Sequence, residues 1–208
     1  MKRYYSSDWH LGHVNMTRAG KDLCGRPFDT PDEMNEAIVT FANETTKPED
    51  ELHILGDIAM GKLDESLPWL ARVHCRLVLY PGNHDRFSYA YQRKGNRLEK
   101  VNREGDRYAV FGAVMFEQEG HPSEFIAPFT APDGGLVKMS HYPYVGDSHG
   151  EDRHADMRPD AQGNRPLVHG HVHTEWQTRD NMFNVGVDVN DFKPVPEEEL
   201  IAWMSTLD

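Results

Sequence analysis

The sequence has little cysteine and no long apolar run. Its two cysteines, Cys24 and Cys75, are too few for a disulfide framework and lack the CxxC spacing of a thiolate metal site, which fits a reducing compartment. No stretch approaches the roughly 18 consecutive apolar residues of a membrane span, and the N-terminal MKRYYSSDWH has no apolar signal-peptide core. We therefore expect a cytoplasmic protein that does not bind membranes.

Positive charge is also scarce, because 22 Lys and Arg stand against 34 Asp and Glu, a formal charge of −12. A surface of this sign repels extended duplex nucleic acid and anionic membranes. Apolar residues are not scarce, since 38% of the chain is hydrophobic, a composition typical of globular proteins. The 208 residues predict one domain, residues 1–208, with two small domains as the less favoured alternative.

The first half of the sequence alternates short apolar runs with helical patterns. Thr30 and Glu33 form a capping-box pattern ahead of apolar residues at a 3.6-residue period, which predicts a helix. Apolar spacing over 63–74 predicts a second helix that Pro68 weakens. The strand-like runs are residues 3–7, 52–55 and 76–80. The resulting order, β-α-β-α-β, favours a layered α/β fold with parallel strands.

After about residue 105 the pattern changes to strand-like stretches with little helix between them, which predicts a second, mixed sheet. These stretches are 108–116, 136–140, 166–169 and 183–189. A last helix is expected from Glu197. Residues 146–165 contain almost no apolar side chains, so we expect a long surface loop there.

Groups that bind metals follow five of the predicted strands. They are Asp8 and His10, Asp57, Asn83 and His84, His141, and His171 with His173. Because the carboxyl ends of the strands in an open α/β sheet meet at one crevice, these residues are expected to lie together. One Asp or His after a strand is an ordinary turn residue, but five such endings are difficult to attribute to turns. One shared site would also account for most of the unusually high content of 12 histidines.

The ligand chemistry of these groups is coherent. Apart from His84, they are two carboxylates (Asp8, Asp57), four imidazoles (His10, His141, His171, His173) and one carboxamide (Asn83). This set, without a thiolate, suits Mn, Fe or Zn and is poor for Ca or copper. Seven groups are too many for one tetrahedral site, whereas two divalent ions that share a bridging carboxylate use them all. We expect Mn first, with Fe, Zn, Co or Ni as alternatives. Such a centre keeps a positive charge and attracts a phosphate ester.

The same residues form motif blocks that resemble the calcineurin-like metallophosphoesterases. The blocks are Asp8-x-His10, Gly56-Asp57, Gly82-Asn83-His84-Asp85, Ser140-His141 and Gly170-His171-x-His173, in that order. The longer phrases SDWHLGH, LHILGDIAMG and NVGVDVNDFKPV look like a short single-domain subgroup of bacteria and their phages. The resemblance implies an αββα four-layer sandwich of two mixed β-sheets flanked by helices, with the dinuclear site at the strand ends, in a bacterial or phage-infected cell.

The resemblance also implies a role for each residue of the site. The first ion would be bound by Asp8, His10 and His173, the second by Asn83, His141 and His171, and Asp57 would bridge the two. His84 would protonate the leaving oxygen or steady the phosphoryl group, oriented by Asp85. A hydroxide that bridges the metals would attack phosphorus in line, with no organic cofactor.

One departure from the family pattern narrows the range of expected substrates. Protein phosphatases of this superfamily follow Gly-Asp with x-x-D-R, whereas Gly56-Asp57 is followed here by IAMG. The missing arginine argues against phosphoprotein substrates, and the acidic composition argues against a DNA repair nuclease. We therefore expect a phosphodiesterase for a small, nucleotide-derived phosphodiester, with 2′,3′-cyclic nucleotides as candidates.

Two alternative functions remain compatible with the motifs. A phosphomonoesterase or nucleotide pyrophosphatase would use the same metal centre. A non-catalytic metal-binding scaffold is less favoured, because a scaffold does not require both Asn83 and His84.

Further residues are candidates for substrate contacts. His13 lies three residues after His10, and Arg18 and Arg26 lie in the loop before the first helix, so each could reach a phosphate or a base. Asn83 would contact substrate as well as metal. In the 146–165 loop, a rim over the pocket is expected from His149, Arg153 and His154. Asn184 and Asp188 are candidates to support the site from behind.

Overall fold

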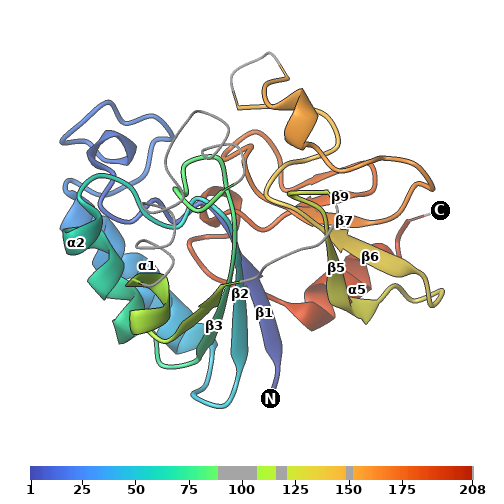
Figure 1. Ribbon diagram of the computed structural model, residues 1–208, viewed down its shortest axis with the longest axis horizontal. Coiled ribbons are helices and arrows are strands. Elements are labelled where there is room, and N and C mark those ends of the chain that lie inside the picture. The colour runs from blue at the N-terminus through green and yellow to red at the C-terminus, as the bar shows by residue number, and fades with distance from the viewer. Residues whose placement is uncertain (89–106, 116–120, 149–151, 208) are drawn as a thin grey trace.

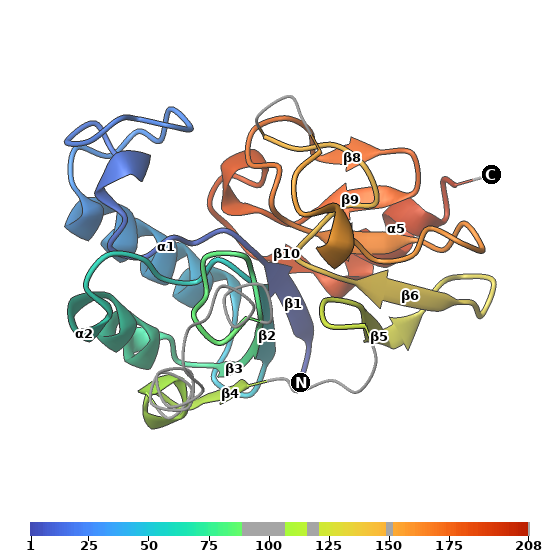
Figure 2. The same cartoon turned by 45° about the horizontal axis from the view of Figure 1, so that its top comes forward.

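The protein contains two five-stranded mixed sheets with helices beside them, as seen in a computed structural model that describes residues 1–88, 107–115, 121–148 and 152–207 (Figures 1 and 2). In the first sheet the order is β10-β1-β2-β3-β4. Its strands are β1 (Arg3–Ser6), β2 (Glu51–Leu55), β3 (Arg76–Tyr80), β4 (Ala113–Met115) and β10 (Val195–Pro196). Strands β1 to β4 are parallel, and β10 pairs antiparallel with β1.

The second sheet has the order β5-β6-β7-β9-β8. Its strands are β5 (Phe125–Thr130), β6 (Leu136–Met139), β7 (Leu167–His169), β8 (Thr178–Arg179) and β9 (Met182–Asn184). The central strands β6, β7 and β9 are parallel, and the edge strands β5 and β8 are antiparallel to their neighbours. The prediction of an α/β protein with two mixed sheets is confirmed.

The helices follow local sequence signals. Helix α1 (Pro31–Thr45) begins with the predicted capping box, in which the Thr30 side chain accepts a hydrogen bond from the Glu33 amide. The predicted helix over 63–74 divides into α2 (Leu63–Ser66) and the 3-10 helix η2 (Leu67–Arg72), because Pro68 has no N–H with which to continue an α-helical ladder. The last helix, α5, is Glu197–Met204. The other 3-10 helices are η1 (Val14–Met16), η3 (Ala155–Met157) and η4 (Val187–Val189).

Two apolar cores lie on opposite faces of the first sheet. One joins Leu52 and Leu77 of the sheet to Met34 and Ile38 of α1 and to Leu67 of η2. The alternate residues of the same strands face the second sheet, as strand geometry requires. This second core contains Tyr5 of β1, Leu55 of β2 and Val78 of β3, with Met139 of β6 and Leu200 of α5. The first sheet is therefore buried on both faces, which explains its continuous apolar runs.

Several stretches differ from the sequence-based expectation. The predicted strand over 183–189 is wrong at its end, because β9 ends at Asn184 and Val187–Val189 form the 3-10 helix η4. The short strands β8 and β10 were not predicted. The predicted strand over 108–116 is wrong at its start, because residues 107–110 are helical and β4 begins only at Ala113, while residue 116 lies outside the described residues. Strand β5 was not predicted, since Pro128 in its middle argues against a strand. The proline is tolerated in β5 because β5 is an edge strand with an irregular register.

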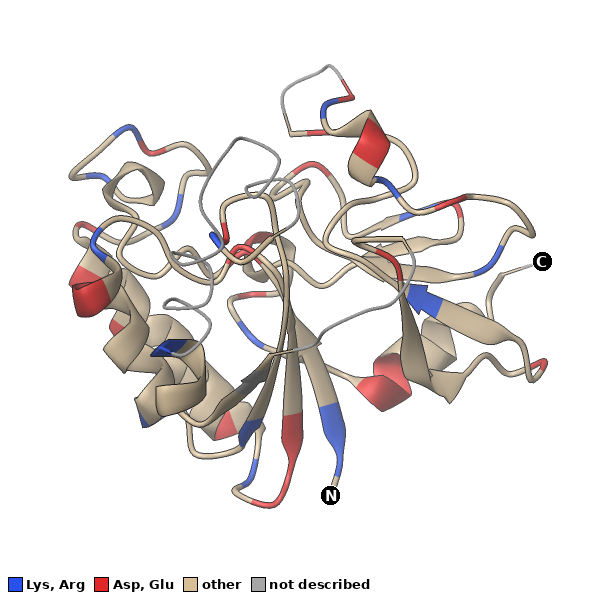
Figure 3. Cartoon of the chain, in the orientation of Figure 1, with Lys and Arg blue, Asp and Glu red and all other residues tan. Residues whose placement is uncertain are grey.

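Charged residues lie at the amino ends of the strands of the first sheet. At the amino ends of β1 to β3, Glu51 contacts Arg3 at 3.9 Å and Arg76 at 2.7 Å. Most charged residues of the described chain lie on helices, loops and these strand ends, around largely uncharged sheets (Figure 3). Among the described residues, no helix is both long and apolar enough to cross a membrane.

A candidate metal site at the strand ends

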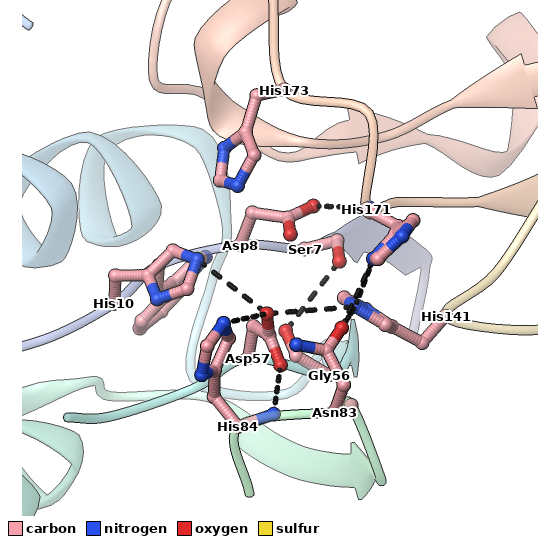
Figure 4. Close-up of polar contacts among 12 residues, drawn as sticks. Ser7, Asp8, His10, Gly56, Asp57, Asn83, His84, His141, His171 and His173 are labelled. Atoms are coloured by element: carbon pink, nitrogen blue, oxygen red, sulfur yellow. Dashed lines mark hydrogen bonds and ion pairs between the residues drawn. The ribbon is translucent and has the colours of Figure 1, made fainter. Parts of the chain in front are cut away.

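The metal-type side chains predicted from the sequence lie together at the carboxyl ends of β1, β2, β3, β6 and β7 (Figure 4). Asp8 and His10 follow β1, Asp57 follows β2, and Asn83 follows β3. The second sheet contributes His141, after β6, together with His171 and His173, after β7. Both sheets thus direct their strand ends at one site.

Five of these residues have an unusual backbone conformation. The positive φ angles are 60° at Asp8, 50° at His10, 52° at Asp57, 74° at His171 and 49° at His173, so five of the eleven left-handed non-glycine residues in the described chain are predicted ligands. Such residues cost about 1–3 kcal/mol each and collect at functional sites. Hydrogen bonds between the loop after β1 and the loop after β2 stabilise this conformation. The Asp8 amide donates to the Gly56 carbonyl, and the His10 amide donates to the Asp57 carbonyl.

Glycines allow the loops to approach each other closely. A Cβ atom at Gly82 would collide with the backbone nitrogen and carboxylate of Asp57. A Cβ atom at Gly170 would collide with the side chains of Ser7 and Asp8. The glycines of two motif blocks are thus required by packing around the carboxylates.

Asp57 lies at the centre of the site. Its Oδ2 is 3.5 Å from His141 Nε2, 3.6 Å from His10 Nε2 and 3.9 Å from His84 Nε2, and its Oδ1 accepts a hydrogen bond from the His84 amide at 2.9 Å. Burial opposes the charge, but the imidazoles of His141 and His10 keep the pKa of Asp57 below its ordinary value. Asp57 is therefore a carboxylate anion within reach of both ligand sets.

One ligand set consists of Asn83, His141 and His171. The His141 Nδ1–H donates to the Leu55 carbonyl at 2.8 Å, so in neutral His141 Nε2 carries a lone pair. The His171 Nε2 is 3.1 Å from a carboxylate oxygen of Asp147, which leaves the lone pair on Nδ1. Burial lowers the pKa of His171 to about 4, which keeps this ring neutral.

These lone pairs face one another. Asn83 Oδ1 is 3.0 Å from both His141 Nε2 and His171 Nδ1, and the two nitrogens are 3.3 Å apart. Three acceptor atoms at these distances repel unless a cation lies among them. The set is therefore suited to hold a divalent metal ion.

The other ligand set consists of Asp8, His10 and His173, whose ligand atoms lie within 4.8 Å of one another. Asp8 Oδ1 and both ring nitrogens of His10 are buried without a hydrogen-bond partner in the described chain. Burial also lowers the pKa of His10 well below its ordinary value, so this imidazole stays neutral and keeps a lone pair. Unpaired buried polar atoms are costly, and a metal ion would satisfy them.

His173 is fixed from behind by a buried ion pair. Its Nδ1 is 2.7 Å from Asp188 Oδ2, and although burial opposes it, this contact raises the pKa of His173 well above its ordinary value. Asp188 also binds the guanidinium of Arg26. The expectation that Asp188 supports the site is thus consistent with the structure, whereas Arg26 is 1% exposed and cannot contact substrate as expected.

The structure assigns Asp85 contacts that differ from the predicted ones. Its carboxylate accepts hydrogen bonds from the backbone amides of Asp57 at 2.7 Å, Gly82 at 2.9 Å and Ile58 at 3.1 Å, rather than from the His84 ring. Asp85 therefore orients the loop that carries Asp57, because the turn at Gly82 directs its side chain under that loop. Burial and the neighbouring Asp57 carboxylate raise the pKa of Asp85 to about 7.

His84 and His13 lie at the open side of the site. The His84 side chain is 44% exposed, in contrast to the buried rings of His10 and His141. The His13 ring centroid is 5.5 Å from that of His10, and burial lowers the pKa of His13 to about 4. Arg18, in contrast, is an exposed residue that pairs with Asp29 at 3.1 Å, so its predicted role in substrate binding is not supported.

Two cavities open beside the site. The smaller, about 160 Å³, is lined by predicted ligands and by His13, His84 and Arg153. The larger, about 440 Å³, is lined by Met60, Tyr108 and His154, again with His84 and Arg153. Two of the three rim residues expected from the 146–165 loop thus line cavities, and the third, His149, lies outside the described residues.

Sequence reasoning missed Asp147. It lies in the polar loop after β6, with a fully buried carboxylate that contacts His171, Arg153 and Arg158. Although burial opposes its charge, the contacts with His171 and Arg153 keep the pKa of Asp147 below its ordinary value. No periodicity marks one aspartate among the many polar residues of this loop, so the sequence carries no signal for it.

Comparisons with known proteins place the chain in a family. No protein-family model matches it. The Gene 66 protein of Mycobacterium phage L5 is 29% identical over 178 residues, covering 82% of this chain and 77% of that protein. A crystal structure of a protein of unknown function from Aquifex aeolicus shares the fold, with a TM-score of 0.67 and 24% identity over 97% of this chain and 98% of that one.

The similarity is also extensive for a second phage protein. The Gene 66 protein of Mycobacterium phage D29 is 30% identical over 206 residues, covering 93% of this chain and 92% of that protein. Identity at this level over nearly the full length of both chains indicates common ancestry. This chain belongs to the family of the mycobacteriophage Gene 66 proteins.

Proposed function

We propose that this protein is a dinuclear metal-dependent phosphodiesterase of the calcineurin-like metallophosphoesterase type, with a small, nucleotide-derived phosphodiester as its substrate. The observation that carries the proposal is the convergence of lone pairs from Asn83, His141 and His171 on one point beside the Asp57 carboxylate. The four-layer αββα arrangement and the dinuclear centre implied by the sequence motifs are part of the same proposal.

The residues present fit two divalent ions. Asp8, His10 and His173 would hold one ion, since Asp8 and His10 offer buried atoms without hydrogen-bond partners and the three residues lie within mutual reach. Asn83, His141 and His171 would hold the other, and Asp57 would contact both. Nitrogen and oxygen ligands without thiolate suit manganese first, and iron, zinc, cobalt or nickel as alternatives.

The ions, when bound, would supply Lewis-acid activation of the phosphoryl group and of water. The chain supplies the surroundings. His141 and His171 are held in one tautomer by the Leu55 carbonyl and the Asp147 carboxylate, so their lone pairs stay directed at the site. The left-handed ligand residues and the amide contacts of Asp85 keep the loops in place before substrate arrives.

His84 has the geometry of a proton donor rather than of a ligand. Its ring is half-exposed, lies farther from Asp57 Oδ2 than the rings of His10 and His141, and lines both cavities. A departing alkoxide in either cavity can therefore receive a proton from His84. This proton transfer completes hydrolysis without a covalent intermediate on the protein.

The cavities support a small substrate. A volume of about 440 Å³ accepts a group of nucleoside size, and the formal charge of −12 disfavours a long polyanion. The wall formed by Ala59, Met60 and Gly61 carries no charged side chain. A diester, with one negative charge, needs fewer cationic contacts than a monoester.

The test is hydrolysis of bis-p-nitrophenyl phosphate by the purified protein with Mn²⁺, compared with p-nitrophenyl phosphate. We expect faster hydrolysis of the diester and loss of activity after chelation. Preference for the monoester would instead favour a phosphomonoesterase. Absence of hydrolysis with Mn²⁺, Fe²⁺, Zn²⁺ and Co²⁺ would overturn the enzyme proposal. Linear dinucleotides and 2′,3′- and 3′,5′-cyclic nucleotides would then define the substrate class.

A further inference from the structure

The loop after β6 is attached to the candidate site through the Asp147 carboxylate. Asp147 Oδ2 is 3.1 Å from His171 Nε2, a ring that belongs to the proposed ligand set. Asp147 Oδ1 accepts hydrogen bonds from Arg153 Nη2 at 2.6 Å and Nε at 3.0 Å. One buried carboxylate thus joins a predicted ligand to an arginine on the loop.

Arg153 uses only one edge of its guanidinium for these contacts. Its Nε and Nη2 bind Asp147, and Nη2 also lies 3.3 Å from Ser148 Oγ. In the described part of the chain, Nη1 has no hydrogen-bond partner, and the side chain is 42% exposed. A planar guanidinium held along one edge presents its remaining N–H groups in a fixed direction.

The Arg153 side chain, with this free guanidinium edge, lies beside the two cavities of the candidate site. Arg153 lines both the cavity that contains the predicted ligands and the larger neighbouring cavity, as do Asn83 and His84. The three residues therefore lie where the two cavities meet. A phosphodiester bound at the metal ligands with an organic group in the larger cavity would bring its phosphoryl oxygens to this junction.

We propose that Arg153 binds a phosphoryl oxygen of the substrate, and that Asp147 positions its guanidinium. This inference rests on the proposed function and names the residue that provides the phosphate contact. Arginine suits this task because its N–H groups match the spacing of phosphate oxygens and stay charged at all relevant pH values. The nearby wall at Met60 and Gly61 offers no charge, so a cation must come from another segment. Arg86 lines only the larger cavity, whereas Arg153 lines both.

The test compares Arg153→Gln and Arg153→Lys with the wild-type protein. We expect Arg153→Gln to lower kcat/KM for bis-p-nitrophenyl phosphate about ten- to a hundredfold, mainly through KM, as loss of a charge-assisted hydrogen bond predicts. Arg153→Lys should recover part of this loss, because a lysine keeps the charge but not the fork. Arg72→Gln is the matched control, since Arg72 is an exposed arginine paired with Glu36, outside both cavities.

A second measurement separates this inference from the proposed function. Inorganic phosphate is titrated by calorimetry into wild-type and Arg153→Gln protein, each loaded with Mn²⁺, and thermal unfolding shows that the variants are folded. We expect the Kd for phosphate to rise at least fivefold in Arg153→Gln. An unchanged Kd and KM in folded Arg153→Gln would overturn the role of Arg153. If Arg153→Gln is unfolded, the same comparison with Arg153→Lys decides. Wild-type protein that binds phosphate through Arg153 but hydrolyses no ester would overturn the proposed function alone.

Discussion

Arg26 and Asp188 form a buried, two-point ion pair between segments 162 residues apart in the chain. Arg26 Nε is 2.7 Å from Asp188 Oδ1, and Nη2 is 3.0 Å from Oδ2. The same guanidinium donates to the backbone carbonyls of Asp8 and Trp9 at 2.6 and 3.0 Å, while Asp188 contacts His173. One arginine therefore fixes two loops that carry predicted ligands.

The first prediction concerns this pair. Arg26→Met leaves the buried Asp188 carboxylate without its arginine partner, with only His173 still beside it, and we expect the free energy of unfolding to fall by about 3–5 kcal/mol. Arg18→Gln removes an exposed pair with Asp29 and should cost less than about 1 kcal/mol. Urea unfolding of both variants, with metal removed by chelation, measures the difference. Equal effects of the two changes would contradict the central position of Arg26.

The second prediction separates metal ligands from the proton donor. His84→Ala should lose most of the turnover, at least a hundredfold, and keep about two ions per chain, because proton donation contributes about that much. His10→Asn should lose bound metal, since both ring nitrogens of His10 lie buried without other partners. Elemental analysis of the purified variants gives the metal content. Loss of both ions in His84→Ala would show that His84 is a ligand.

The third prediction concerns acid stability. Burial lowers the pKa of His169 to about 3, against 6.5 for an unperturbed histidine. Between these values the unfolded chain binds a proton that the folded protein does not, so the contribution of His169 to stability is complete above pH 6.5 and is lost as the pH falls towards 3. Unfolding of metal-free protein is measured across this range. The His169→Gln variant should show a smaller loss of stability, and an identical pH profile would refute the assignment.

The fourth prediction concerns the close approach at Gly82. In Gly82→Ala the new methyl group collides with Asp57, so we expect weaker metal binding and a tenfold or greater loss of activity. Gly134→Ala is the control, because Gly134 has open space around it and a positive φ of 82°, which costs only about 1 kcal/mol for alanine. Metal titrations monitored by calorimetry compare the metal affinities of the two variants. Equal metal affinities would show that the loop adapts to the extra methyl group.

Much of the fold and site follows from local sequence signals. The capping box at Thr30 and the apolar runs that became β1, β2 and β3 are local patterns, and the groups after these strands meet because parallel strands end at one edge. Strand β5 escaped prediction because Pro128 is admissible only at a sheet edge, and edge position is a property of the whole fold.

Other features depend on tertiary contacts that carry no sequence signal. Arg18 and Arg26 are two arginines in one loop, and only packing decides that the second is buried and the first exposed. Asp147 acquires its role through contact with His171, which lies in another part of the chain. Asp85 was expected to orient the ring of the adjacent His84, but the tight turn at Gly82 turns it to the backbone amides instead.

The left-handed backbone at Asp8, His10, Asp57, His171 and His173 limits which replacements can be interpreted. Valine, isoleucine or threonine at any of these positions would clash with the main chain, so the effect of the clash could not be separated from the loss of the ligand. Glycine tolerates this conformation at any of the five positions, and asparagine tolerates it in place of the histidines, so these replacements remove the ligand with the least disturbance of the loop. Natural variation at these five positions should therefore be restricted by shape as well as by chemistry, and a relative that has lost its ligands should have glycine at these positions, or asparagine in place of a histidine.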